Sequence, residues 1–182
     1  MSIQFSVKAQ VKDVLRDLSK AQREVVPEST VAALNRATER TQTASVRETA
    51  SALQIKPKVA RGLLRFQRRD RARKLFWTAG IYTVIGDLPA GKLGKIRQQK
   101  KGAKAGKYLF EGAFKATIKQ SNHTGIYKRK GKPRFPIVEQ RVKIRDKIEP
   151  IIIQKIQTVG IPEFNYEFHR QLQWRLRRRG LL

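Results

Sequence analysis

Residues 86–95 read GDLPAGKLGK and directly follow the apolar, β-branched run of residues 81–85. A strand followed by G-x-x-x-x-G-K is close to the pattern of a nucleotide-binding P-loop. A working P-loop needs Ser or Thr after its lysine to hold magnesium, and here that position is Leu93. The loop should also enter a helix, whereas Gly94 comes next and Pro89 removes a backbone amide. The stretch therefore does not predict a nucleotide site.

Charge is the strongest compositional signal. The 182 residues include 41 Lys and Arg against 14 Asp and Glu, which gives a net charge of +27. Such a field attracts polyanions, above all nucleic acid. A highly charged solvated surface, or basic faces that meet acidic protein partners, would give the same composition.

Composition also limits the class of protein. There is no cysteine, so disulfides and thiolate metal sites are excluded. No run approaches the roughly 18 uninterrupted apolar residues of a membrane span, and residues 1–13 do not resemble a signal peptide. With 40% hydrophobic residues, a modest core is expected. These features favour a protein of the reducing cytoplasm, or of a particle assembled there.

Hydrophobic spacing predicts helices near the start of the chain. An amphipathic helix is expected from Val7 to Val25, ended by Pro27, and a second from Pro27 to about Leu53. The inner face of the second helix carries mostly small side chains, so this helix needs closely packed neighbours, which another subunit could supply. This face comprises Val31, Leu34, Ala37, Thr41, Ala44 and Ala52.

Strands are predicted for the middle of the chain. Residues 63–66 and 75–78 are expected to form a β-hairpin around a charged turn, with a further strand at 81–85. Later strands are expected at residues 108–110, 113–118, 125–127 and 137–138, with Val142 and Ile144 continuing the last. Residues 92–107, rich in Gly and Lys and without a hydrophobic period, are interpreted as a long mobile loop.

Two helices are predicted to close the chain. Pro150 is expected to open the first, which ends at Gly160. Pro162 is expected to open the second, whose apolar stripe includes Phe168 and Leu172, and both side chains are expected to be buried. The predicted fold is α+β: N-terminal helices, a central antiparallel sheet with a long basic loop, and two C-terminal helices. An N-terminal helical region at 1–55 and a body at 56–182 are expected to form one domain.

No set of residues predicts catalysis. His123 and His169 have no Cys or acidic cluster beside them, and nothing indicates that Asp87 and Glu111 meet. No catalytic residue, metal ligand or cofactor-binding residue is therefore proposed.

The ordered motifs resemble the minor tail protein Z family of tailed bacteriophages, the lambda-type tail-completion proteins. The resemblance rests on GDLP followed by KLG, a strand at residues 112–114, and a basic turn leading to residues 134–137. The similarity also includes the helix segments at residues 32–37 and 46–49 and a basic C-terminal helix. All of these segments occur in the same order as in the family, so the similarity spans residues 30–180.

The resemblance implies a structural, non-enzymatic virion protein at the head-proximal end of the tail, assembled in the host cytoplasm. Such proteins act as homo-oligomeric rings around the DNA path, beside tail-terminator, tail-tube or neck proteins. GDLPAGKLGK then becomes a structural turn, with glycines supplying backbone conformations that side chains hinder and prolines fixing bends. The turn residues are Gly86, Pro89, Gly91 and Gly94, with Pro136 further along.

The Lys-rich loop and the basic turn are the candidate contact surfaces. They could face DNA in the ring lumen, binding phosphates without sequence preference, or they could dock on an acidic neighbour. The candidates are Lys92, Lys95, Arg97, Lys100, Lys101, Lys104 and Lys107, with Arg68, Arg69 and Arg71 of the turn. The rival hypothesis is a free ribosome- or nucleoid-associated protein in which Phe66, Phe76 and Tyr108 stack bases.

Overall fold

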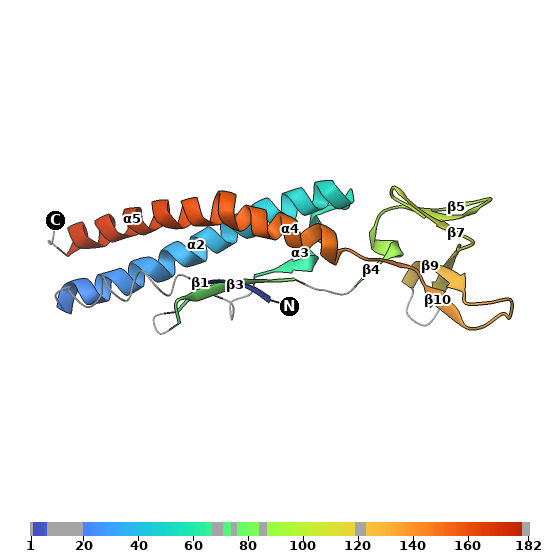
Figure 1. Ribbon diagram of the computed structural model, residues 1–182, viewed down its shortest axis with the longest axis horizontal. Coiled ribbons are helices and arrows are strands. Elements are labelled where there is room, and N and C mark those ends of the chain that lie inside the picture. The colour runs from blue at the N-terminus through green and yellow to red at the C-terminus, as the bar shows by residue number, and fades with distance from the viewer. Residues whose placement is uncertain are drawn as a thin grey trace. The chain divides into compact units, whose positions relative to one another are not determined.

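The computed structural model of the chain describes residues 2–6, 20–66, 71–73, 76–83, 87–118 and 123–179. These fall into two compact units, each assembled from separate stretches of sequence. Unit 1 comprises Met1–Val46, Leu63–Val84 and Pro150–Leu182, and unit 2 comprises Arg47–Gly62 and Ile85–Glu149. The division cuts across the boundary expected between residues 55 and 56. The order of helices and antiparallel strands confirms the α+β class (Figure 1).

Unit 1 contains a three-stranded antiparallel sheet in the order β1-β3-β2. Its strands are β1 (Ser2–Ser6), β2 (Leu64–Arg65) and β3 (Thr78–Thr83). The hairpin expected between 63–66 and 75–78 does not form, because β2 pairs with the end of β3, Leu64 opposite Thr83. Burial explains this register, since Ala79 and Ile81 are inside and Tyr82 is exposed. The charged turn at residues 67–70 lies outside the described residues.

The first long helix, α2 (Lys20–Leu53), passes through Pro27 instead of ending there. Proline removes one helical N–H bond, but packing on both sides of it offsets this loss. Val25, Val26, Ser29 and Thr30 are buried, and both hydroxyls donate to carbonyls four residues earlier. Most of the helix predicted before Pro27 (residues 7–19) lies outside the described residues.

The two predicted C-terminal helices form one continuous helix. It runs through α4 (Arg145–Lys155), a π-helical turn η3 (Ile156–Gly160) and α5 (Ile161–Arg178). Pro150 therefore lies inside α4, and Gly160 does not end a helix. A Cβ at Gly160 would lie 2.9 Å from Thr41 Oγ1, so glycine serves close packing between α2 and the C-terminal helix.

The core of unit 1 lies between α2, α5 and the sheet. Leu34, Ala37 and Thr41 of the small face are buried inside the chain, so this part of the face is not left for another subunit. Phe164 is buried, while Phe168 and Leu172, both expected to be buried, are half-buried. The buried cluster comprises Ala33, Leu34, Ala37, Ala72, Ala79 and Phe164, with Val31, Phe66, Trp77 and Phe168 packed against it.

Helices α2 and α5 run antiparallel, side by side, in unit 1 (Figure 1). Arg36 pairs with Glu167 at 3.3 Å, and one turn further along α2 Arg40 pairs with Glu163 at 3.0 Å. Glu167 is only 1% exposed and also accepts a 2.7 Å bond from Arg170. Burial by itself raises the pKa of Glu167, but the hydrogen bond and charge of Arg170, with the charge of Arg36, bring the net shift downward.

Unit 2 contains two three-stranded antiparallel sheets, β5-β6-β7 and β10-β9-β8, and a two-stranded sheet of β4 and β11. The first sheet comprises β5 (Ile96–Gln99), β6 (Gly102–Ala105) and β7 (Tyr108–Glu111), and the second β8 (Phe114–Ile118), β9 (His123–Arg129) and β10 (Ile137–Glu139). The third pairs β4 (Leu88–Pro89) with β11 (Arg141–Val142). These confirm the strands predicted at 108–110, 113–118, 125–127 and 137–138; Ile144 lies beyond β11. Helix α3 (Pro57–Leu63) falls mostly in this unit.

The expectation of a mobile loop at residues 92–107 is wrong, because these residues contain β5 and β6. The misleading feature is the composition of β6, GAKA, which has no large apolar side chain. Ala103 and Ala105 are nevertheless fully buried, and both neighbouring strands pair with β6. The backbone ladders and small buried side chains therefore order a segment whose sequence resembles a loop.

Candidate nucleic-acid and assembly interface

The GDLPAGKLGK stretch folds without the features of a phosphate-binding loop. After β4 the chain makes one short 3₁₀ turn, η2 (Ala90–Lys92), and then enters β5, not a helix. Leu93 is buried at 1% exposure, whereas Lys92 points to solvent. The stretch anchors unit 2 through Leu93 and leaves no helix N-terminus to receive phosphate.

Two glycines of this stretch allow close backbone approach. A Cβ at Gly91 would lie 2.9 Å from the carbonyl oxygen of Thr124. Gly94 has φ +143°, and a Cβ at this residue would lie 3.3 Å from the backbone of Gly106. Gly86 lies outside the described residues, and Pro89 lies in β4, opposite Arg141. Pro136 follows a cis peptide bond, and its carbonyl accepts the N–H of Lys130 at 3.1 Å.

The β5-β6-β7 sheet has a basic face and an inner face. Arg97, Lys104 and Leu109 lie opposite one another across the three strands and therefore share one face. The other face carries Ala103 and Ala105, both buried. Directly opposed like charges destabilise a strand pair, so the Arg97–Lys104 pair would gain from an anion above it. Lys100 and Lys101 form the exposed turn between β5 and β6.

Most predicted cations of this segment are available for a partner. Lys92, Lys95, Arg97, Lys100 and Lys101 are exposed, and Lys104 is half-buried. Within the described part of the chain, none of the six has an acidic side chain at ion-pair distance. Between residues 92 and 134 the sequence holds fourteen Lys and Arg and a single acid, Glu111.

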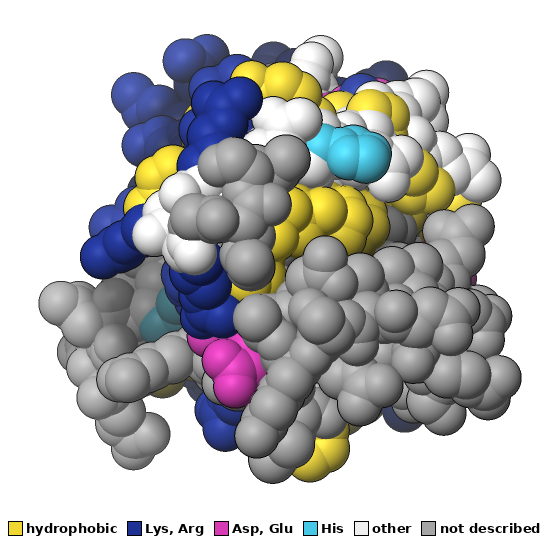
Figure 2. Space-filling view, turned by 90° about the vertical axis from the view of Figure 1, so that its left-hand side faces the viewer, with side chains coloured by type: hydrophobic (Ala, Val, Ile, Leu, Met, Phe, Trp, Pro, Cys, Tyr) yellow, Lys and Arg dark blue, Asp and Glu magenta, His cyan; other side chains and the backbone are white. Residues whose placement is uncertain are grey.

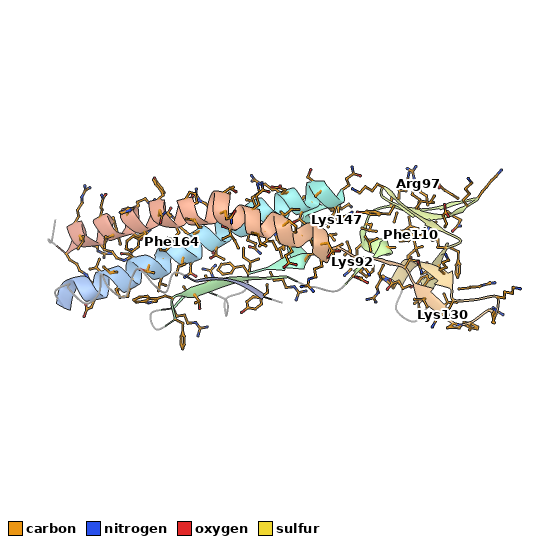
Figure 3. All side chains as sticks on the ribbon, in the orientation of Figure 1. Lys92, Arg97, Phe110, Lys130, Lys147 and Phe164 are labelled. Carbon is orange, nitrogen blue, oxygen red and sulfur yellow. The ribbon has the colours of Figure 1, made fainter. Side chains whose placement is uncertain are left out.

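Lys107 differs from the other six lysines and arginines of the segment. Its Nζ donates to the carbonyl oxygen of Ala52 at 3.1 Å and lies 5.5 Å from the centre of the Tyr108 ring. Lys147 approaches the same ring at 5.8 Å. Lys107 therefore makes contacts within unit 2. Arg97, labelled in Figure 3, lies on β5, an edge strand of its sheet.

The predicted arginine turn belongs to unit 1. Arg68 and Arg69 lie outside the described residues, and Arg71 already has partners. Arg71 pairs with Glu39 and lies 5.4 Å from the centre of the Phe66 ring. Elsewhere in unit 1, Figure 2 shows Lys and Arg side chains gathered beside hydrophobic side chains on the face it presents. That face holds the end of α5, where Arg175 and Arg178 flank Trp174 at 5.5 and 5.3 Å.

The hairpin of β9 and β10 is the surface that sequence reasoning did not select. Every residue from 128 to 138 is exposed. Its cations are Lys128, Arg129, Lys130, Lys132 and Arg134. The charge run KRKGKPR at residues 128–134 is the sequence signal for this surface, although by itself it predicts no more than a basic turn.

No arrangement in the described residues resembles a catalytic or metal centre. Among them, no group of three or more His, Asp or Glu could hold a metal ion. His123 Nε2 lies 2.9 Å from Glu139 Oε1, which joins β9 to β10. Tyr127 is buried beside them; burial first, and then the negative charge of Glu139, raises its pKa. No helix in the described part of the chain is long and apolar enough to cross a membrane.

Fold and surface together describe a strongly basic α+β protein whose β5-β6-β7 sheet carries exposed cations on one face. Residues 9–179 match the family described as prophage minor tail protein Z (GPZ). The match covers nearly the whole chain, and the chain belongs to this family. It is therefore a structural phage tail protein of the virion. No curated protein and no solved structure matches the chain.

Proposed function

We propose that this tail protein is a completion or neck component that forms a homo-oligomeric ring around the DNA path at the head-proximal end of the tail. The basic face of the β5-β6-β7 sheet would line the lumen. The observation that carries this proposal is the row of Arg97 and Lys104, directly opposed across two strands without an acidic partner among the described residues.

A lumen surface must attract DNA without holding one register. Long, exposed Lys and Arg side chains meet phosphates and carry no sequence information directly. Order in the strands also supports this role, because the cations project from a fixed ladder and lose little backbone entropy on binding. Electrostatic repulsion between copies in the ring would be offset when DNA occupies the channel.

Contacts between copies would need apolar area on each subunit. The helix α5 exposes Tyr166 by 63% and Trp174 by 54%. Aromatic side chains of this size are enriched at protein interfaces. They support an oligomer more directly than the small face of α2, whose residues 34, 37 and 41 are buried within unit 1.

The rival hypothesis, a free single-strand binder, would need a platform of exposed aromatics. Phe66 packs against the core of unit 1, and Tyr108 is half-buried beneath two lysines. Of the three candidates only Phe76 is well exposed, at 68%. A stacking platform made of these three residues is therefore not supported.

Purified phage that encodes this chain provides the test. Quantitative mass spectrometry should find the chain at a fixed, multiple copy number per particle, and a gold-labelled terminal tag should mark the head-proximal end of the tail. A label at the distal tip, or a chain absent from purified virions, would overturn the proposal.

A further inference from the structure

We propose that the tip of the β9–β10 hairpin, residues 128–138, is a docking element for an acidic protein neighbour in the tail, separate from the surface proposed for DNA. The inference rests on the chain acting as a tail component, and it adds a partner of stated chemistry. Figure 3 shows Lys130 on this hairpin and Arg97 on the other sheet of unit 2.

The tip has the charge that an acidic partner would recognise. Five cations lie between residues 128 and 134 without an intervening acid. Among the described residues, none of the five has an ion-pair partner. At close range in a partly dehydrated contact, such a cluster would favour carboxylates and disfavour another cationic surface.

The tip also exposes apolar side chains, and these distinguish a protein partner from nucleic acid. Phe135 is 67% exposed, Val138 48% and Ile137 36%. Phosphates gain nothing from such groups, whereas a protein pocket buries them favourably. Aromatic anchors surrounded by charge are typical of protein interface centres. The basic face of the β5-β6-β7 sheet, by contrast, presents Lys, Arg and Gln side chains with one exposed apolar side chain, Leu109, and no exposed aromatic ring beside them.

The tip is held in a defined shape. The N–H of Lys130 donates to the carbonyl of Pro136 at 3.1 Å, and Ile137 pairs with Arg129 where β10 begins. Arg134 lies 5.9 Å from the centre of the Phe135 ring. Strand β10 is an edge of its sheet in the described residues, so its outer main-chain groups are available as well.

A second copy of this chain is a poor occupant. The chain carries only 14 acids against 41 bases, and copies would repel each other at this surface. Several of the acids are already engaged within the fold, as Glu167 and Glu163 are with arginines of α2. The charge balance therefore favours a different, acidic protein of the tail.

The test separates docking from DNA binding with two matched sets of variants. Phe135→Ser and Val138→Ser, made separately, remove apolar groups at the tip, and Lys130→Glu with Lys132→Glu reverses its charge. The control variant removes positive charge from the β5-β6-β7 sheet by combining Lys95→Gln, Lys100→Gln and Lys101→Gln. Each is supplied in trans to a phage lacking this gene, and its copy number in purified tails is measured. Affinity for a short DNA duplex is measured on the purified proteins.

We expect each tip variant to lower incorporation into tails about tenfold or more, the loss typical when an anchoring group is truncated. The melting temperature should be unchanged because these side chains are exposed. Duplex affinity should stay within about twofold of wild type for the two serine variants and fall for the control.

Normal incorporation of all tip variants would overturn the inference. So would a loss of duplex affinity in Phe135→Ser or Val138→Ser equal to that of the control, which would make the tip a nucleic-acid contact. Absence of the wild-type chain from tails would instead contradict the proposed function, so the two failures are distinguishable.

Discussion

The side chain of Gln98 joins the two three-stranded sheets of unit 2, because its Oε1 accepts the backbone N–H of Lys115 at 2.8 Å. Its Nε2 donates to the carbonyl of Gly102 at 3.0 Å and approaches that of Ala113 at 3.4 Å. One glutamine on β5 thus satisfies main-chain groups of β6, of β8 and of the residue before β8. It fixes the basic sheet against the sheet that carries the β9–β10 hairpin.

Replacing Gln98 with Ala should destabilise unit 2. It leaves the Lys115 amide and two carbonyls without this partner; because these groups are exposed or only partly buried, the expected cost is about 0.5–1.5 kcal/mol, the net value of a typical hydrogen bond. Gln99→Ala is the matched control, because the Gln99 side chain is equally exposed but makes no hydrogen bond to any of the described residues. Urea unfolding of both variants measures the difference. Equal midpoints would show that the Gln98 bonds contribute nothing net.

Gly106 should not tolerate a side chain. It begins the two-residue turn between β6 and β7 with φ +56°, and a Cβ there would lie 2.6 Å from the Leu93 carbonyl oxygen. Gly106→Ala should therefore lower the melting temperature and disturb the packing of Leu93. Gly62→Ala in α3 is the contrasting control, because a Cβ there meets nothing within 4 Å. That change should be neutral or stabilising by up to about 1 kcal/mol. A tolerated Gly106→Ala would contradict the turn geometry.

Glu167 should make the stability of unit 1 depend on acid pH. Burial raises the pKa of Glu167, but the hydrogen bond and charge of Arg170, the charge of Arg36 and the hydrogen bond of Gln171 together lower it below its ordinary value in the folded chain. A carboxyl group whose pKa is lowered by folding stabilises the folded state at pH values above its unfolded pKa of about 4.3. This stabilisation is lost as the pH falls through the pKa of the folded state. Wild type should exceed Glu167→Gln in stability at neutral pH, and the gap should narrow below about pH 4.3. Melting curves of both proteins from pH 3 to 7 test this prediction. A difference in stability that stays constant over this range would contradict a lowered pKa of Glu167.

DNA binding should depend steeply on salt and weakly on sequence. Each phosphate contact contributes about −0.9 to the slope of log affinity against log salt. Lys100→Gln with Lys101→Gln should make the slope shallower. Lys107→Gln should change the slope less, because the Lys107 amino group is already held by the Ala52 carbonyl. Fluorescence titration of a duplex at several salt concentrations measures this. Binding that ignores salt, or strongly prefers one sequence, does not fit a DNA conduit.

The sequence predicted most of the later strands because apolar and β-branched residues mark them, as at residues 108–110 and 125–127. It failed where tertiary packing overrides local preference. Pro27 and Gly160 are typical helix-ending residues, yet burial beside Pro27 and the approach of Thr41 to Gly160 keep both inside helices. Strand β6 was missed because buried alanines give no hydrophobic period.

The basic candidates were found from charge alone, but charge could not separate their roles. Only the structure shows Lys107 bonded within the fold, Arg71 paired with Glu39, and Arg97 opposite Lys104. Burial and pairing depend on residues distant in the sequence, so composition could not predict them.

Electron cryo-microscopy of the head-proximal end of the tail tests the central claim most directly. The account predicts a closed ring of copies of this chain, with Arg97, Lys100, Lys101 and Lys104 facing the DNA axis. A single copy, or a ring whose β5-β6-β7 sheet faces outward onto protein, would contradict it.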